Sequence, residues 1–361
     1  MPPEAARFPD RLWRVRQSLL TDDLEALLFL DMRNIRYLTG FTGSDGVFLL
    51  ERHQSLLMVD GRYTTQAGME ARGIGVFQYR EKLAGIAEVI ADKAMRAVGF
   101  EAAALSFETY GKLKEKVPAT NLRPLGEELV NIRAIKDAGE VALLRTAATM
   151  ASRALIATRE LIRPGMEENE VALELEYRMR QNGSTGASFP IIVAAGANSA
   201  LPHATPGTRK LAPGDALVID YGAVVAGYHS DETCTFVLGE ASGRFTEVYE
   251  IVKTAHDRAL AAVKAGVTCA EIDHLTRDCI EQAGLGRFFS HGTGHGVGLD
   301  VHEPPRIAPS SQAVLAAGMV VTIEPGVYLP GEWGIRIEDM VLVREHDCEV
   351  LTGTPKNLTI L

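Results

Sequence analysis

The sequence predicts a mixed α/β protein of the α+β type, in which a small N-terminal α/β domain precedes a larger C-terminal domain built from a duplicated helix-and-strand unit. Three observations predict this fold class. The chain has 361 residues, helical and strand-like patterns alternate along it, and its C-terminal two-thirds contains an internal repeat. A chain of this length exceeds the size at which one hydrophobic core usually stops growing. We therefore expect two domains, residues 1–128 and residues 129–361.

The first domain is expected to alternate helices and strands. Helical spacing of apolar residues runs from Phe8 to Leu20, and a further helix is expected from Arg62 to Arg72. Short apolar runs predict strands at 26–31, 47–51, 55–60, 76–79 and 97–100. The stretch 117–128 contains two prolines and a glycine, and we interpret it as the linker between the domains. None of these segments carries a recognisable chemical motif.

A long amphipathic helix from about Asp137 to Leu161 is expected to open the second domain, and the internal repeat follows it. A helix pattern closed by glycine recurs 101 positions later, with Gly165, Glu170 and Gly183 matching Gly266, Glu271 and Gly284. The strand PGDALVIDYG (213–222) recurs 104 positions later as AGMVVTIEPG (317–326). Asp220 thereby corresponds to Glu324. One carboxylate at the same place in both copies indicates two halves around a shared site.

Composition and charge exclude several classes of protein. Apolar residues make up 46% and charged residues 23% of the chain, which is ordinary for a soluble globular protein. No apolar run approaches a membrane span of about 18 residues, and the N-terminus does not read as a secretory signal. We expect a cytoplasmic protein without membrane contacts. The net charge of −10 argues against a nucleic-acid partner, and the four cysteines lack metal or disulfide spacing.

Acidic residues in apolar strands are the first candidates for chemistry. A buried, unpaired carboxylate costs several kcal/mol, so Asp220 and Glu324 each need an exposed strand end or a compensating cation. Asp231 follows Asp220 across an expected turn at Ala226-Gly227. In such a hairpin the two aspartates face each other or lie diagonally, with Cβ atoms about 5 to 8 Å apart. Two like charges this close need a counter-ion.

A second hairpin is expected over 320–343, where Glu324 and Glu338 lie on successive strands around a Pro/Gly-rich loop. Period-two alternation places Arg336 on the same face as Glu338, where it could hold a carboxylate or bind a substrate terminus. The four acids together carry a charge of −4, which two divalent cations would neutralise. Oxygen ligands with one imidazole suit Mn²⁺, Co²⁺, Fe²⁺ or Zn²⁺.

The imidazole is expected from FSHGTGHGVGLDVHEPP (289–305), in which His291, His295 and His302 lie among glycines. Alternating glycines let a backbone pass close to a bound group without a Cβ in the way, so we interpret this segment as a strand or loop that lines a cleft. The glycine spacing does not match a nucleotide-binding loop, and the chain lacks a G-x-S-x-G nucleophile motif. A metal-bound water is therefore the expected nucleophile. Taken alone, His203 would be an ordinary surface histidine.

Five segments in order, VIDYG, SDETCTF, GTGHGVGLDVHE, TIEPGVY and RIEDMVLV, resemble the M24 metallopeptidases. The resemblance covers the C-terminal domain and implies the duplicated pita-bread fold, in agreement with the internal repeat. The N-terminal domain further resembles that of the creatinase, prolidase and Xaa-Pro aminopeptidase branch. Its motifs, such as MVDGRY (58–63), are less specific.

The resemblance implies two divalent metal ions per subunit. Asp231 and Glu338 would bridge the ions, Asp220 would bind one of them, and His295 and Glu324 would bind the other. A hydroxide between the ions would attack the peptide carbonyl, and Glu324 would carry the proton to the leaving amine. Mn²⁺ is the metal that we expect first.

The resemblance also assigns substrate contacts. His203 and His302 match histidines that hydrogen-bond the scissile carbonyl or the tetrahedral intermediate, so they are candidate catalytic and substrate-binding residues. His291 and Arg336 match positions near the leaving-group pocket, where a proline ring is recognised. An X-Pro bond has no N–H and a fixed ring, so a dedicated apolar pocket is required.

The function expected first is an Xaa-Pro aminopeptidase that acts on proline-containing peptides. An Xaa-Pro dipeptidase (prolidase) is the alternative, because Arg336 would serve either enzyme. A methionine aminopeptidase would not explain the N-terminal domain, and creatinase-like hydrolases lack the metal set that is intact here. A non-catalytic binding module would show a broken ligand set. We also expect a homodimer, because a first domain without chemistry of its own could wall a neighbour's active site.

Overall fold

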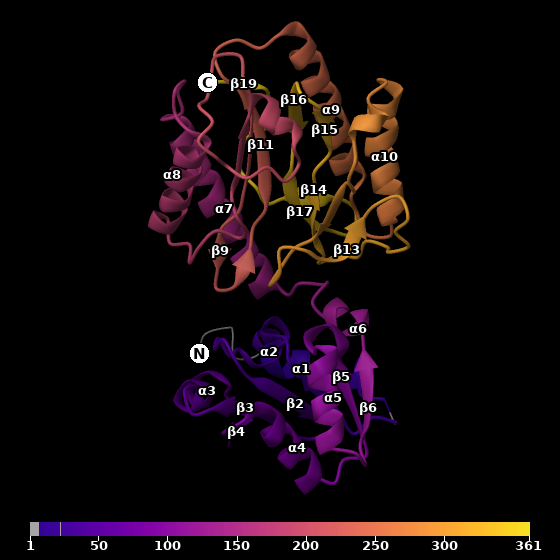
Figure 1. The fold of residues 1–361 in the computed structure, drawn as a ribbon. Helices are drawn as coiled ribbons and strands as arrows, with labels where there is room; N and C mark the ends of the chain where they lie inside the picture. Colours follow the sequence, from indigo (N-terminus) through magenta and orange to yellow (C-terminus); the bar gives the residue numbers. More distant parts are fainter. Residues whose placement is uncertain (1–6, 22) are drawn as a thin grey trace. The chain divides into compact units, whose positions relative to one another are not determined.

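The computed structural model describes residues 7–21 and 23–361, which form two compact units (Figure 1). The first unit ends at Arg133 and the second begins at Ala134. Each unit combines helices with at least one sheet, which confirms the mixed α/β class. Within the described residues, no helix combines the length and the apolar character that a membrane span requires.

The N-terminal unit is organised around a six-stranded sheet. Its strands, in spatial order, are β4 (Gly75–Tyr79), β3 (Ser55–Asp60), β2 (Val47–Glu51), β1 (Ala26–Phe29), β5 (Ala97–Glu101) and β6 (Asn121–Leu125). The pairs β1–β2 and β2–β3 are antiparallel, and the other three pairs are parallel. The five strands expected from apolar runs are confirmed.

The stretch 117–128, interpreted as a linker, instead contains β6, and every residue of this strand pairs with β5. Pro124 lies within β6. Proline cannot donate a ladder hydrogen bond and is therefore confined to edge strands, and β6 is an edge strand. Pro124 therefore marks the edge of the sheet and not a boundary between the domains.

Helices cover both faces of the N-terminal sheet (Figure 1). On one face, α4 and α5 bury apolar strand residues such as Leu28, Leu49 and Met58. Phe29 and Phe48 contact each other with ring centroids 5.9 Å apart, and they point away from that core because side chains alternate along a strand. The helices of this unit are α1 (Arg7–Leu19), α2 (Met32–Thr39), α3 (Thr64–Glu70), α4 (Lys82–Asp92), η1 (Ala102–Ala104), α5 (Phe107–Lys116) and α6 (Glu127–Asn131).

The C-terminal unit consists of two similar halves. The first half contains α7 (Ala138–Arg159), α8 (Glu168–Gln181), η2 (Gly196–Ala200), the sheet β19-β11-β8-β7 and the hairpin β9–β10. Its strands are β7 (Ile192–Ala195), β8 (Ala216–Tyr221), β9 (Val224–Val225), β10 (Tyr228–His229), β11 (Glu232–Val237) and β19 (Thr359–Ile360). The expected helix from Asp137 to Leu161 is confirmed as α7, which Asp137 and Glu140 cap reciprocally.

The second half contains α9 (Gly243–Ala262), α10 (Cys269–Gln282), η3 (Gly286–Phe288), the sheet β13-β12-β14-β17-β18 and the hairpin β15–β16. Its strands are β12 (Gly294–Gly296), β13 (Glu303–Ile307), β14 (Val320–Ile323), β15 (Gly326–Leu329), β16 (Trp333–Arg336), β17 (Asp339–Val343) and β18 (Cys348–Val350). The helices α7 and α8 flank one side of the strands and α9 and α10 the other (Figure 1). One hydrophobic core packs α7 and α8 against β7, β8 and β11, a second packs α9 and α10 against β13, β14 and β17, and a third combines residues of both halves.

The internal repeat is confirmed in three dimensions. The helices α8 and α10 have the same length and begin 101 residues apart, and each begins with a capping box. Gly183 and Gly284, just after these helices, both have positive φ values, 101° and 76°, which glycine adopts at little cost. The strands β8 and β14 begin 104 residues apart.

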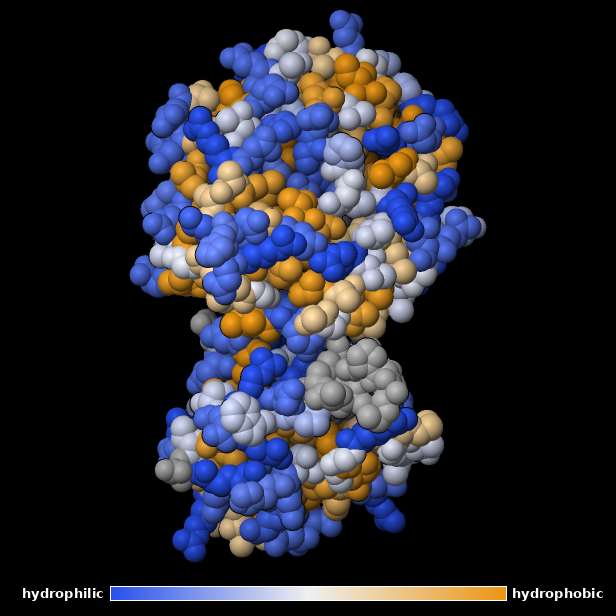
Figure 2. Space-filling view, turned by 180° about the vertical axis from the view of Figure 1, so that it is seen from behind, coloured by the Kyte–Doolittle hydropathy of each residue, from blue (hydrophilic) through white to orange (hydrophobic). Residues whose placement is uncertain are grey.

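One face of each unit is seen in Figure 2. On the face seen in Figure 2, hydrophilic residues are interspersed with hydrophobic ones on each unit. Single exposed apolar residues are normal on a folded protein.

Candidate metal centre

All five candidate metal ligands lie where strands of the two halves meet. Asp220 is near the end of β8, and Asp231 immediately precedes β11. These two come from the first half. The second half contributes the other three, which are His295 in β12, Glu324 directly after β14 and Glu338 directly before β17.

The first hairpin brings the two aspartates onto one face. Ala226 and Gly227 form the expected turn, and both have positive φ values of 47° and 78°, as a type I′ turn requires. In the register of β8 and β11, Asp220 lies opposite Thr233. Asp231 is two residues before Thr233, so the two aspartates share a face as a diagonal pair.

The second hairpin is interrupted at the two glutamates. The strand β14 pairs with β17 up to Ile323 and Asp339, and β15 pairs with β16 from Gly326 and Arg336 onward. Glu324 and Glu338 occupy the break between these two ladders. The backbone N–H of Glu338 donates to Thr233 O at 3.1 Å, which ties the break to β11 of the other half. The break therefore brings both glutamates toward the aspartates.

Three of the five candidate ligands, Asp231, His295 and Glu338, have ligand atoms close enough to share one ion. Asp231, His295 and Glu338 are buried, and each offers one ligand atom within 4.8 Å of the others. His295 Nε2 lies 3.6 Å from Asp231 Oδ2 and 3.6 Å from Glu324 Oε1. His295 Nδ1 lies 3.0 Å from Gly296 O, and a carbonyl can only accept, so Nδ1 carries the proton. Nε2 is then the free lone pair that a metal ligand needs.

Burial makes this cluster electrostatically unfavourable by itself. Burial, followed by the charges of neighbouring acids, raises the pKa of Asp231 and of Glu338 well above their ordinary values. The pKa of Glu324 rises to about 8, chiefly through burial. Burial lowers the pKa of His295 to about 4, so its imidazole is neutral at pH 7. A divalent cation favours ionised carboxylates and a neutral imidazole, which is the donor set assembled here.

Asp220 supplies a second indication that the residues fit a metal. Its Oδ2 accepts from Arg336 Nη2 at 2.6 Å. Its Oδ1 is buried and, among the described residues, accepts no hydrogen bond. A buried carboxylate oxygen without a partner is costly, and coordination of a cation removes that cost. The five residues therefore fit a site for divalent cations.

A hydrogen-bonded chain links Arg336 to His291. Arg336 Nη1 donates to the hydroxyl of Tyr328 at 2.9 Å, and that hydroxyl lies 2.9 Å from His291 Nε2. His291 Nδ1 lies 2.8 Å from Gly292 O, so it carries the proton and Nε2 accepts from Tyr328. Burial lowers the pKa of His291 to about 4, and the charge of Arg336 contributes to this shift. His291 is therefore neutral at pH 7.

The two remaining candidate histidines, His203 and His302, are exposed. The ring of His302 lies 4.3 Å from the ring of His295, centroid to centroid. His203 follows η2, on a loop whose backbone Arg336 Nη1 contacts at Pro202 O, 3.2 Å away. These contacts place both histidines at the margin of the carboxylate cluster. They are free to meet a molecule that enters from solvent.

Two residues of the site escaped sequence reasoning. Thr233 Oγ1 donates to Glu338 Oε2 at 2.7 Å and accepts from Arg336 Nε at 3.1 Å, so it orients both side chains. Tyr328 joins Arg336 to His291. The position of Thr233, two residues after Asp231 on the same face of a strand, was the available signal. No comparable signal marks Tyr328.

The glycines around His295 have a different role from the one expected. A Cβ on Gly294 would overlap Thr322 O of β14, and one on Gly296 would overlap Pro304 O of β13. A Cβ on Gly292 or Gly298 would likewise meet Ile307 O or Glu303 Oε2. These glycines admit neighbouring protein strands, rather than a bound group. They allow β12, which carries His295, to lie between β13 and β14.

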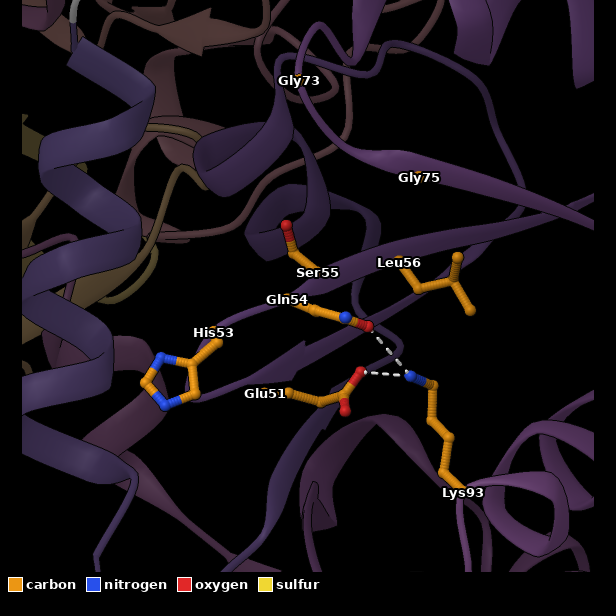
Figure 3. Close-up of a pocket in the computed structure, with 8 residues that line it drawn as sticks. All are labelled: Glu51, His53, Gln54, Ser55, Leu56, Gly73, Gly75 and Lys93. Carbon is orange, nitrogen blue, oxygen red and sulfur yellow. Dashed lines mark hydrogen bonds and ion pairs between the residues drawn. The ribbon is translucent and has the colours of Figure 1, made fainter.

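A hollow in the N-terminal unit shows none of this chemistry. Its lining, drawn in Figure 3, is Glu51, His53, Gln54, Ser55, Leu56, Gly73, Gly75 and Lys93. Lys93 Nζ lies 2.8 Å from Glu51 Oε1 and 3.3 Å from Gln54 Oε1, so the lysine pairs with groups of the same hollow. No candidate metal ligand or substrate-binding residue lies there.

Comparisons with known proteins match both units. Residues 142–345 match the model of metallopeptidase family M24, and residues 11–135 match the creatinase/prolidase N-terminal domain. The uncharacterized peptidase YqhT of Bacillus subtilis (strain 168) is 37% identical over 339 residues, which cover 94% of this chain and 96% of that protein. The Xaa-Pro dipeptidase of Pyrococcus furiosus is 34% identical over 349 residues, which cover 97% and 99%.

Solved structures agree with these matches. The Xaa-Pro dipeptidase from Bacillus anthracis is 38% identical with a TM-score of 0.95, and the match covers 98% of this chain and 100% of that one. The X-Pro aminopeptidase from Thermotoga maritima MSB8 is 35% identical with a TM-score of 0.90, over 97% and 99% of the two chains. Both similarities extend over both units.

The close contact of Gly294 with β14 predicts that an added methyl group at this position weakens metal binding. Gly294→Ala should push β12 away from β14, displace His295 and weaken Mn²⁺ binding about tenfold or more, because a close-packed backbone has no room for the added atom. Isothermal titration calorimetry on the metal-free protein measures the change. Gly243→Ala is the matched control, since a Cβ there meets nothing within 4 Å. Equal Mn²⁺ affinity of Gly294→Ala and the parent protein would contradict this account.

Proposed function

The chain belongs to metallopeptidase family M24, and from this premise we propose that it is an Xaa-Pro aminopeptidase, which removes the N-terminal residue from peptides whose second residue is proline. The observation that carries the proposal is the buried cluster of Asp231, His295 and Glu338, with ligand atoms all within 4.8 Å of one another. The names of the similar proteins, Xaa-Pro dipeptidase and X-Pro aminopeptidase, support proline as the recognised residue.

Family M24 implies a dinuclear metal site, and we assign its ligands to five residues: Asp220, Asp231, His295, Glu324 and Glu338. Four carboxylates and one neutral imidazole suit Mn²⁺ first, with Co²⁺, Zn²⁺ or Fe²⁺ as alternatives. The charge of −4 on the four carboxylates balances the charge of +4 on two divalent cations. When bound, such ions lower the pKa of water and polarise a peptide carbonyl.

The chain's own residues then orient the substrate and move the proton. We propose that a carboxylate oxygen of Glu324 takes the proton of the attacking water and delivers it to the nitrogen of the leaving proline. His302 and His203 are exposed at the margin of the cluster. Their imidazoles would donate hydrogen bonds to the scissile carbonyl oxygen, where negative charge develops.

The proline ring of the substrate would lie against His291. This imidazole is neutral and its Nε2 is occupied by the hydroxyl of Tyr328, so it offers the ring an uncharged face. Phe289 packs edge-on against His291 with centroids 5.1 Å apart, which adds apolar surface behind it. An apolar wall suits a ring that has no N–H to satisfy.

Arg336 bears on the choice between aminopeptidase and dipeptidase. A dipeptidase needs a cation that is free to bind the carboxylate of the substrate's terminal proline. Each guanidinium nitrogen of Arg336 already donates to the protein, with Nε bonded to Thr233, Nη1 to Tyr328 and Nη2 to Asp220. This engagement favours the aminopeptidase. The Xaa-Pro dipeptidase is the second candidate, because several similar proteins carry that name.

Two substrates separate these functions. Protein loaded with Mn²⁺ should release Ala from Ala-Pro-Ala at least about tenfold faster than from Ala-Pro, a difference in barrier of about 1.4 kcal/mol. Chromatography of the products measures both rates. Asp231→Asn, which keeps the shape of the side chain and removes one charge, should abolish both. Faster cleavage of Ala-Pro would select the dipeptidase instead, and failure to cut either peptide would overturn the proposal.

We further propose that the protein is a homodimer. The N-terminal unit carries none of the residues assigned to the metal centre, so a role in walling the active site of a second subunit would explain its presence. Light scattering at working concentration should give about twice the chain mass of 39.1 kDa. A monomeric mass would contradict this assembly.

A further inference from the structure

The two acids that immediately precede β11 and β17, and that we assign to the metal centre, are each followed by a second acid. Glu232 follows Asp231, and Asp339 follows Glu338. Side chains alternate along a strand, so the second acid of each pair points to the opposite face. Glu232 is fully buried and Asp339 is 5% exposed. Two further carboxylates are therefore buried directly behind the metal centre.

Lys356 lies between these two acids. Its Nζ is 2.5 Å from Glu232 Oε1 and 3.3 Å from Asp339 Oδ1, and its side chain is only 8% exposed. Burial by itself would lower the pKa of Lys356, but Asp339, Cys234 and Glu232 raise it well above the ordinary value. The lysine is therefore charged. It belongs to the segment between β18 and β19 near the C-terminus, far from both acids in sequence.

The two acids belong to different halves of the duplicated unit. Glu232 begins β11 in one sheet, and Asp339 begins β17 in the other. The backbone hydrogen bond from Glu338 N to Thr233 O joins the two segments, and on the face toward the metal centre Thr233 Oγ1 donates to Glu338 Oε2. On the opposite face, Lys356 joins them through charge. A change in the distance between β11 and β17 would change the distance between Asp231 and Glu338.

Further hydrogen bonds hold the two acids in place. Glu232 Oε2 accepts from the hydroxyl of Tyr221 at 2.6 Å and from Ser152 Oγ at 2.7 Å. Its Oε1 accepts from Thr354 N at 3.1 Å, in the same segment as Lys356. Asp339 Oδ1 accepts from Thr352 Oγ1, and His256 Nε2 lies 3.2 Å from Asp339 Oδ2. The lysine therefore bridges two carboxylates whose positions are each fixed in their own half.

We infer that Lys356 is a positioning residue for the metal centre, which fixes the separation of Asp231 and Glu338 by pairing with Glu232 and Asp339. The inference rests on the proposed function, because it takes Asp231 and Glu338 as metal ligands. Lys356 itself faces away from the site and contacts neither of them in the structure. Groups that orient metal ligands in this way typically change metal affinity 10- to 100-fold when they are removed.

The direction of the change in metal affinity distinguishes positioning from charge. A lysine near a cation site repels the cation, so removal of the charge alone would tighten metal binding. Loss of positioning would weaken it. A residue that only stabilised the fold would lower the melting temperature and leave the metal affinity unchanged. The three roles therefore give three different results.

The test is titration of metal-free, full-length protein with Mn²⁺ by isothermal titration calorimetry. Lys356→Met should raise the dissociation constant about 10- to 100-fold. Lys356→Arg, which keeps the charge and can reach both acids, should restore the affinity to within about threefold of the parent protein. The control is Lys264→Met, which removes an exposed lysine of the same unit and should leave the Mn²⁺ dissociation constant unchanged.

Unchanged or tighter Mn²⁺ binding by Lys356→Met would overturn the inference. If Lys356→Met does not fold, Mn²⁺ binding is measured with Lys356→Gln, whose amide still donates to Glu232 but carries no charge to bridge the two acids. Unchanged or tighter binding by Lys356→Gln would then overturn the inference. Circular dichroism and the melting temperature establish which variants are folded. Failure of the parent protein to bind Mn²⁺ would instead refute the proposed metal centre, so the two failures are distinguishable.

Discussion

The C-terminal unit depends on holding four carboxylates together in a buried site. Burial and mutual repulsion raise the pKa of Asp231 and Glu338, so the protein by itself disfavours the ionised cluster. Arg336 offsets part of this charge by pairing with Asp220 at 2.6 Å. The rest of the charge suits divalent cations, and the surrounding strands, glycines and hydrogen bonds keep the oxygens in place until a cation binds.

Duplication explains why such a site arises where two halves meet. Each half contributes a strand with a carboxylate at its end, Asp220 on β8 and Glu324 after β14, and the matching helices α8 and α10 begin 101 residues apart. The contact between β11 and β17 then decides the spacing of the remaining acids. Both faces of that contact carry specific bonds, with Thr233 on one side and Lys356 on the other.

The sequence predicts what local pattern and repetition encode. Periodicity located α7 and the five strands of the N-terminal sheet, and the repeat aligned Asp220 with Glu324. Local sequence patterns do not predict which distant segments pair with each other. The strand β6 looked like a linker because Pro124 reads as a breaker until its edge position is known. Likewise, the contacts of Gly294, Tyr328 and Lys356 are with residues that only the fold brings close.

The most direct test of the central claim is anomalous diffraction from crystals soaked in MnCl₂. The account predicts two manganese peaks per chain, both within coordination distance of side chains among Asp220, Asp231, His295, Glu324 and Glu338. The carboxylate oxygens and the Nε2 of His295 should be the contacting atoms. Manganese peaks elsewhere in the chain, with none in this cluster, would contradict it.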